Sequence, residues 1–120
     1  NLTSRIKKKK DLFDVNCVKL IKDKKNNAIY FSRLPIPFSN NFKNTKYYKQ
    51  VCIIPFRRNF LIKYINMKQT NLEKFESIDM LRILENGHKV KTVEIKKITF
   101  PVDTVKDLKK VSVLMKKNNE

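Results

Sequence analysis

Hydrophobic residues in the first half of the chain fall into short runs separated by polar, basic stretches. Over residues 11–22 the apolar positions fit a strand and a helix face equally well, so the periodicity leaves both open. A second apolar run at 28–31 leads to Pro35 and Pro37, which impose an extended path. The polar, Asn-rich residues 39–46 then predict a loop.

The second half carries the pattern of a compact domain, which we expect to begin near residue 47. Four segments there are predicted as strands because of their β-branched and aromatic residues or their apolar–polar alternation, namely residues 51–54, 60–67, 89–100 and 111–115. Pro55 ends the first of them. Residues 101–110 predict a connection or a short helix.

The clearest local signal lies between the second and third predicted strands. Thr70 and Glu73 have the spacing of a capping box, which marks a helix start. Residues 71–85 contain no Pro or Gly and predict one helix. The sole glycine, Gly87, stands where a helix end requires a left-handed residue. The apolar positions of this helix spread around its cylinder, so we expect it to be covered on more than one side.

The order of these elements predicts an α+β fold, with one main helix packed on a small, mostly antiparallel sheet. We expect two parts, a basic N-terminal extension at 1–46 and an α+β RNA-binding domain at 47–120. The extension begins with an extended basic tail that ends in four adjacent lysines at 7–10. Because these lysines repel one another, we expect the tail to become ordered only on a polyanion.

The net charge of the chain indicates what kind of partner it binds. The 120 residues include 28 Lys and Arg against 11 Asp and Glu, which gives a net charge of +17. Self-repulsion at that charge opposes compactness, and a bound polyanion would relieve it. A pI near 10 is typical of nucleic-acid binders. Codon bias in an AT-rich genome is the alternative source of the many lysines, but it does not account for the shortage of acidic residues.

The sequence shows no catalytic or metal-binding constellation. No HExxH, GxSxG, P-loop or GxGxxG motif occurs. Cys17 and Cys52 lie far apart, and His88 has no base or nucleophile beside it. We therefore expect no enzymatic activity, no catalytic residue, no metal, no cofactor and no small-molecule substrate. No apolar run approaches the length of a membrane span, so no transmembrane segment is expected either.

Basic side chains in the tail, in the aromatic-containing loop and at predicted strand ends are the candidate RNA contacts. They are Lys7, Lys8, Lys9, Lys10, Lys43, Lys46, Arg57, Arg58, Lys96, Lys97, Lys109 and Lys110. Arg57 and Arg58 are the strongest pair, because guanidinium groups bind phosphate through two hydrogen bonds and arginine is scarce in this chain. A turn with solvated charges is the alternative for this pair.

Several short motifs between residues 51 and 115 follow one family's order. They are a strand ending in proline at 51–55, a strand at 60–67, the helix start Thr70-Asn71-Leu72, the turn at Gly87, V-x-x-V at 90–93 and K-K-V-S-V-L at 109–114. In this order they resemble universal large-subunit ribosomal protein twenty-three, particularly its mitochondrial form. The resemblance implies a structural protein that binds ribosomal RNA and neighbouring ribosomal proteins in the mitochondrial ribosome. The glycine- and arginine-rich loop of bacterial members has no counterpart at 98–108.

Two alternatives remain open. Leu34-Pro35-Ile36-Pro37 is similar to a stretch of small-subunit ribosomal protein ten, which would keep the function class and change the subunit. The chain would otherwise be an accessory interaction subunit of a mitochondrial membrane complex, with its basic tail against anionic lipid.

Overall fold

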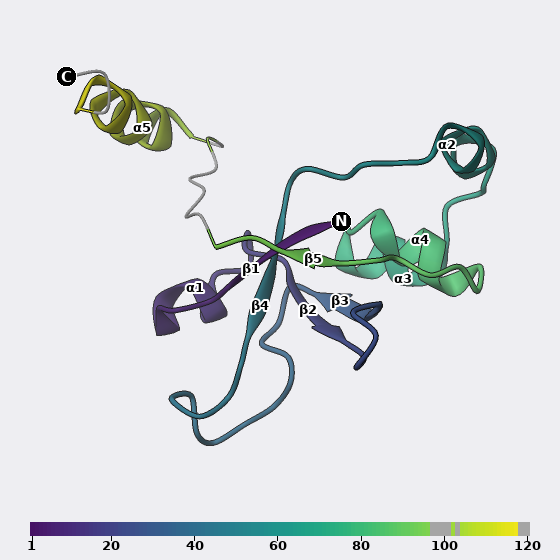
Figure 1. The fold of residues 1–120 in the computed structure, drawn as a ribbon, viewed down its shortest axis with the longest axis horizontal. Helices are drawn as coiled ribbons and strands as arrows, with labels where there is room; N and C mark the ends of the chain where they lie inside the picture. The colour runs from purple at the N-terminus through teal and green to yellow at the C-terminus, as the bar shows by residue number, and fades with distance from the viewer. Residues whose placement is uncertain (97–101, 103, 118–120) are drawn as a thin grey trace.

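A computed structural model describes residues 1–96, 102 and 104–117 of the chain. Five strands form one sheet: β1 (Leu2–Arg5), β2 (Lys19–Lys22), β3 (Ala28–Ser32), β4 (Tyr48–Val51) and β5 (Val93–Glu94). Five helices complete the described part of the fold (Figure 1): α1 (Lys9–Phe13), α2 (Arg58–Ile65), α3 (Asn71–Glu76), α4 (Met80–Glu85) and α5 (Val105–Lys117).

The strands follow the order β3-β2-β4-β1-β5 in the sheet. Neighbouring strands are antiparallel except for β1 and β5, which run parallel. The predicted α+β class with a mostly antiparallel sheet is therefore confirmed. The prediction of one main helix is wrong, because several helices accompany the sheet.

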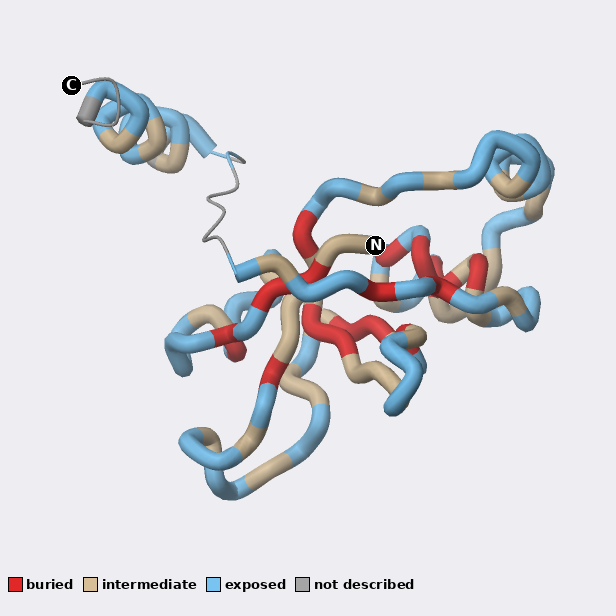
Figure 2. Tube along the Cα trace, viewed as in Figure 1, coloured by how far each residue is buried: buried red, intermediate tan, exposed pale blue. Residues whose placement is uncertain are grey.

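The main core lies between the β2–β3 hairpin and α4. Leu20, Phe31 and Leu81 are completely buried there, and Met80 almost so. Burying these side chains removes apolar surface from water, which supplies most of the stability of such a small core. In Figure 2 the buried segments gather around the sheet and α4, whereas α2 and α5 are largely exposed.

The predicted helix at 71–85 is divided in two. The Glu73 half of the capping box is confirmed, since the Glu73 carboxylate accepts a hydrogen bond of 3.3 Å from the Thr70 backbone N–H. The helix stops at Ser77, whose φ of 53° is left-handed. This break changes the direction of the chain, so that α4 turns its apolar side chains onto the hairpin. Gly87, with φ 73°, has the left-handed conformation that its position predicted.

Two predicted strands are helices instead. Residues 60–67 fall mostly within α2, where Phe60 and Tyr64 lie one turn apart and both pack near Phe56. Residues 111–115 lie within α5. In both segments β-branched side chains suggested a strand, but the spacing of three or four between apolar residues also fits one helix face.

The other predicted strands are shorter or shifted. Residues 51–54 contribute only Val51 to β4, and 89–100 contribute only β5, with 97–100 outside the described residues. The first ten residues, predicted as a tail, contain β1 and the start of α1. One sheet takes β1, β2 and β3 from before residue 46 and β4 and β5 from after it. Whether the chain folds as the units 1–46 and 47–120 stays a prediction.

Candidate active site

The basic side chains chosen from the sequence lie on separate parts of the surface. Lys97 falls outside the described residues, and the other members of the set are exposed: Lys7, Lys8, Lys9, Lys10, Lys43, Lys46, Arg57, Arg58, Lys96, Lys109 and Lys110. They come from α1 and the turn before it, the loop before β4, the start of α2, the residues after β5, and α5. The structure therefore does not assemble them into one binding surface.

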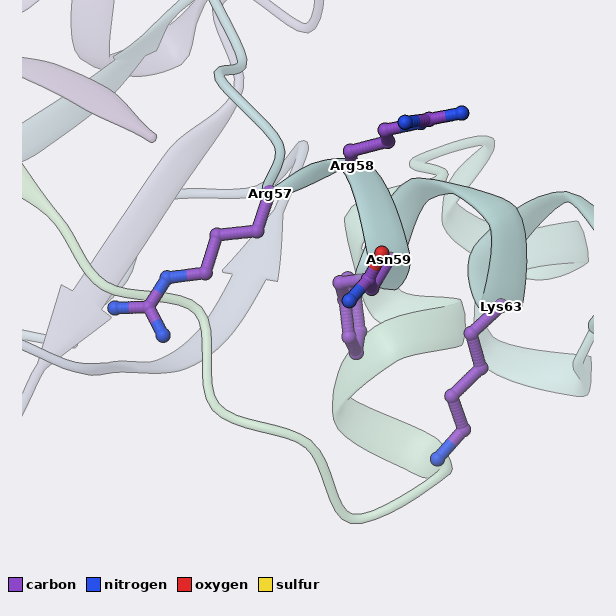
Figure 3. Close-up of a pocket in the computed structure, with 5 residues that line it drawn as sticks. Arg57, Arg58, Asn59 and Lys63 are labelled. Atoms are coloured by element: carbon purple, nitrogen blue, oxygen red, sulfur yellow. The ribbon is translucent and has the colours of Figure 1, made fainter.

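Arg57 and Arg58 open a shallow hollow of about 560 Å³ at the start of α2, which Asn59, Phe60 and Lys63 also line. Figure 3 shows the two arginine side chains pointing away from each other. Neither guanidinium has a partner among the described residues. The hollow can attract anions, but its arginines do not converge on one phosphate.

A more organised polar cluster lies where β3 ends beside α3. The Glu76 carboxylate accepts hydrogen bonds through both oxygens. Its Oε1 accepts from the Ser32 hydroxyl at 3.0 Å and the Tyr30 hydroxyl at 3.4 Å, and its Oε2 accepts from the Arg33 backbone N–H at 2.9 Å. Burial raises the pKa of Tyr30, and the Glu76 carboxylate raises it further, so this hydroxyl stays protonated as a donor. Glu76 is thus a positioned carboxylate rather than a solvated helix charge.

Arg33 connects three segments through its guanidinium. Its Nε donates to the Glu76 carbonyl at 2.8 Å, its Nη1 to the Val15 carbonyl at 2.9 Å and its Nη2 to the Ser77 carbonyl at 2.9 Å. A guanidinium carries five N–H donors, so these bonds leave two unused. The Arg33 guanidinium is therefore held in one orientation, and its two unused N–H groups are donors for an anionic or hydroxylated ligand.

Lys19 supports the same cluster from inside the protein. It is completely buried, and its Nζ donates to the Asp14 carbonyl at 2.8 Å and to the Arg33 carbonyl. Desolvation lowers the pKa of Lys19, against the opposing charges of Cys17 and Asp14. Because both of its bonds go to backbone carbonyls, Lys19 positions Arg33 rather than offering a free cation.

A second charged pair holds the helices together. Arg82 binds Glu73 through Nη2 at 2.5 Å and through Nε at 2.8 Å, and its guanidinium lies 4.9 Å from the centre of the Tyr64 ring. The hydrogen bond from Arg82 lowers the pKa of the Glu73 carboxyl, and burial partly opposes this. This pair links α2, α3 and α4 and occupies both carboxylate oxygens of Glu73 with hydrogen bonds from Arg82.

Among the described residues, no group of three or more His, Cys, Asp or Glu side chains could hold a metal ion. No helix in the described part of the chain is long and apolar enough to cross a membrane.

The cluster around Arg33 and Glu76 brings a guanidinium, a carboxylate and two hydroxyls together. Such a set offers hydrogen-bond donors to an anion and both donors and acceptors to hydroxyl groups. Sequence reasoning missed it. The available signals were the period-two placement of Tyr30 and Ser32, and Arg33 as the one arginine between residues 6 and 56.

Comparison with known proteins assigns the chain. The family model described as cytidylyltransferase matches residues 1–98. The chain belongs to the cytidylyltransferase family. It is 39% identical over 118 residues to the 3-deoxy-manno-octulosonate cytidylyltransferase of Fusobacterium nucleatum, and 40% identical over 116 residues to that of Solibacter usitatus. These alignments cover 98% and 96% of the chain but 48% and 46% of the relatives. The chain therefore spans about half the length of the curated relatives it matches.

A solved structure agrees with this assignment. The chain matches CMP:2-keto-3-deoxy-manno-octonic acid synthetase, solved in complex with CTP, with a TM-score of 0.88 and 33% identity. The match covers 98% of this cytidylyltransferase chain and 48% of the synthetase chain. The mixed α+β fold is accordingly nucleotidyltransferase-like.

These findings overturn the ribosomal interpretation. The resemblances to large-subunit protein twenty-three and small-subunit protein ten are wrong, as is the accessory membrane-complex alternative, because the family match covers most of the chain. The expectation of a non-enzymatic protein is wrong, since the relatives are enzymes. Ribosomal RNA and ribosomal proteins as the partners, without a small-molecule substrate, are overturned by a neighbour complexed with CTP. A mitochondrial ribosomal location has no support among these bacterial relatives.

Proposed function

We propose that the chain is part of an enzyme that transfers a cytidylyl group from CTP to 3-deoxy-manno-octulosonate. The observation that carries this proposal is identity of 39–40% along almost the whole chain to enzymes named for that reaction. The CTP complex of the structural neighbour supports the nucleotide half of the reaction.

The reaction places specific demands on the protein. A hydroxyl oxygen of the sugar acid attacks the α-phosphorus of CTP, the bond from that phosphorus to the β-phosphate bridge breaks, and diphosphate leaves with the bridging oxygen. The hydroxyl proton passes to a base or to solvent. Catalysis of such transfers depends mainly on positioning the two reactants and on stabilising negative charge.

The Arg33–Glu76 cluster is the part of this chain best suited to the sugar acid. The unused N–H donors of Arg33 would bind its carboxylate, and Glu76 would accept from its hydroxyl groups. Lys19 would act only by positioning Arg33, because its ammonium group is occupied by backbone carbonyls.

The basic surface residues have a different role in this proposal. Arg57, Arg58 and Lys63 carry positive charge around the hollow at the start of α2. With RNA overturned as the partner, the triphosphate of CTP is the polyanion that they would attract. Their direct contact with an anion stays a prediction.

A chimera tests the proposed reaction. This chain would replace the matched part of the Fusobacterium nucleatum relative, and diphosphate release from CTP would be measured with and without 3-deoxy-manno-octulosonate. We expect release only when both substrates are present. A folded chimera that binds CTP but releases no diphosphate would contradict the proposal.

Variants of the same chimera test the cluster. Arg33→Lys keeps the charge but loses the planar fork, so kcat/KM for the sugar acid should fall about 10- to 100-fold while KM for CTP stays close to that of the parent. Glu94→Gln is the control, because Glu94 lies on β5 and pairs with Arg5 and Lys22 instead. Equal losses toward both substrates in Arg33→Lys would argue against a sugar-acid site.

A further inference from the structure

Ser77 has a backbone conformation that residues with a Cβ seldom adopt. Its φ of 53° and ψ of 48° are left-handed, and among the described residues Asn26, at φ 61°, is the one other non-glycine residue with positive φ. The conformation brings Cβ close to the following carbonyl oxygen, so single residues that adopt it are mostly Gly or Asn. A serine in this conformation is held there by its surroundings, which is typical of functional sites.

The left-handed residue ends α3 and turns a carbonyl group toward Arg33. In a continuing helix the Ser77 carbonyl would accept from the backbone N–H of Leu81, four residues further on. In the structure the Leu81 N–H donates instead to the Ile78 carbonyl at 3.1 Å. The Ser77 carbonyl is therefore available to Arg33, whose Nη2 donates to it at 2.9 Å.

Two consecutive carbonyls hold the Arg33 guanidinium. Its Nε donates to the Glu76 carbonyl at 2.8 Å, beside the bond from Nη2 to Ser77. Because a guanidinium is planar and its donors have fixed directions, these bonds set the plane of the group. A third bond joins the same segments, since the Glu76 carboxylate accepts from the Arg33 backbone N–H at 2.9 Å. Rotating residue 77 out of the left-handed region would move its carbonyl and break this set.

We propose that Ser77 is a positioning residue of the candidate site. Its left-handed backbone fixes the orientation of the Arg33 guanidinium and, through the bonds between residues 33 and 76, the direction of the Glu76 carboxylate. The effect on orientation follows from these hydrogen bonds, whereas its consequence for sugar-acid binding rests on the proposed function. Ser77 acts through its backbone carbonyl and not as a substrate ligand.

The backbone conformation of residue 77 can be changed without disturbing the core, because its side chain is exposed. Ser77→Thr keeps the hydroxyl and adds a β-branch, which disfavours the left-handed region. Ser77→Asn has the opposite effect, because asparagine tolerates that region better. Asn26→Thr is the matched control. Asn26 is also exposed and left-handed, but it lies in the turn between β2 and β3, where its carbonyl accepts from Thr92.

Proton exchange at the Arg33 Nε–H, followed by NMR on the full chain, reports the orientation of the guanidinium without any activity. The resonance is assigned by its loss in Arg33→Lys. We expect exchange to be at least about threefold faster than in the parent in Ser77→Thr, slower than in the parent in Ser77→Asn, and within about 1.5-fold of it in Asn26→Thr.

Equal acceleration in Ser77→Thr and Asn26→Thr would overturn the proposal, because a general loss of stability would then explain both. Exchange in Ser77→Asn as fast as in the parent, or faster, would also overturn it. The comparison with Ser77→Asn decides the question even if Ser77→Thr does not fold.

Kinetics of the chimera test the consequence for the reaction. In Ser77→Thr the KM for 3-deoxy-manno-octulosonate should rise at least about threefold while the KM for CTP stays within about 1.5-fold, and Asn26→Thr should leave both unchanged. A purely structural role would impair both substrates alike. An inactive chimera, with the exchange order kept in the chain, would overturn only the proposed function. An active chimera without that order would overturn only the positioning role.

Discussion

The β2–β3 hairpin with α3 and α4 differs from α2 and α5 in where its side chains find partners. In the first region Phe31 and Leu81 are fully buried, and the buried charges of Lys19 and Glu73 are hydrogen-bonded within the chain. In the second, Ile65 of α2 is 66% exposed, and Leu108 and Met115 of α5 are 54% and 63% exposed. The first region is complete in itself, whereas the second leaves large apolar side chains exposed.

The sharpest test of this contrast is one substitution made in both regions. Leu81→Ala should lower the free energy of unfolding by about 3 kcal/mol, because it leaves a cavity in the packed core. Leu108→Ala should change it by about 0.5 kcal/mol or less in the chain alone. Urea unfolding followed by circular dichroism would measure both. Similar losses at the two positions would mean that α5 already packs on this chain.

Substitution of Glu73 tests whether the Glu73–Arg82 pair holds helices α2, α3 and α4 together. Glu73→Gln should cost about 2 kcal/mol at neutral pH, because it removes charge-assisted hydrogen bonds to Arg82. The folded pKa of Glu73 lies below its ordinary value of 4.5, so the stabilisation is full above that pH and is lost as pH falls through the folded pKa. The difference between parent and variant should therefore shrink in acid. A difference that stays constant from pH 7 to pH 3 would show that the ionised carboxylate contributes nothing.

Substitution of Lys19 tests whether this buried side chain supports the candidate site around Arg33 and Glu76. Lys19→Met keeps the length of the side chain but leaves the Asp14 and Arg33 carbonyls without a donor. Relief of a buried charge offsets part of this loss, so we expect a net cost of about 1.5 kcal/mol. Lys9→Met is the matched control, since Lys9 is exposed, and it should be neutral in the same unfolding assay. Equal stability of the two variants would show that the buried hydrogen bonds of Lys19 do not stabilise the fold.

Gly87 gives the smallest expected effect within the complete region. A Cβ at this position would meet nothing within 4 Å, so only the backbone conformation, with φ 73°, opposes a side chain. Gly87→Ala should therefore cost about 1 kcal/mol in thermal or urea unfolding. A stabilising effect would show that the turn tolerates an ordinary residue.

Local signals in the sequence predicted local structure well. The capping residue Glu73 and the left-handed Gly87 each act within one helical turn, so their neighbours in sequence are their neighbours in space. The strand predictions for the segments that form α2 and α5 were wrong. β-branched residues at mixed spacing fit both a strand and a helix, and packing decides between them. The left-handed Ser77 divides the predicted helix, but no glycine or proline marks this position in the sequence, so the break was not predicted.

The candidate site depends on contacts that sequence patterns do not reveal. Arg33 and Glu76 are 43 positions apart, and only the packing of α3 beside β3 brings them together. The net charge of +17 indicated an anionic partner but could not distinguish RNA from a nucleotide and a sugar acid. The proposed function rests on the family match, and the candidate site on the fold.

Hydrogen exchange on the chain alone tests the contrast between the two regions most directly, because one experiment reports on both. We expect the backbone amides of β2 and β3 to exchange slowly, and those of α5 to exchange nearly as fast as in an unstructured peptide. Protection of α5 equal to that of β2 and β3, in the absence of any partner, would contradict the account.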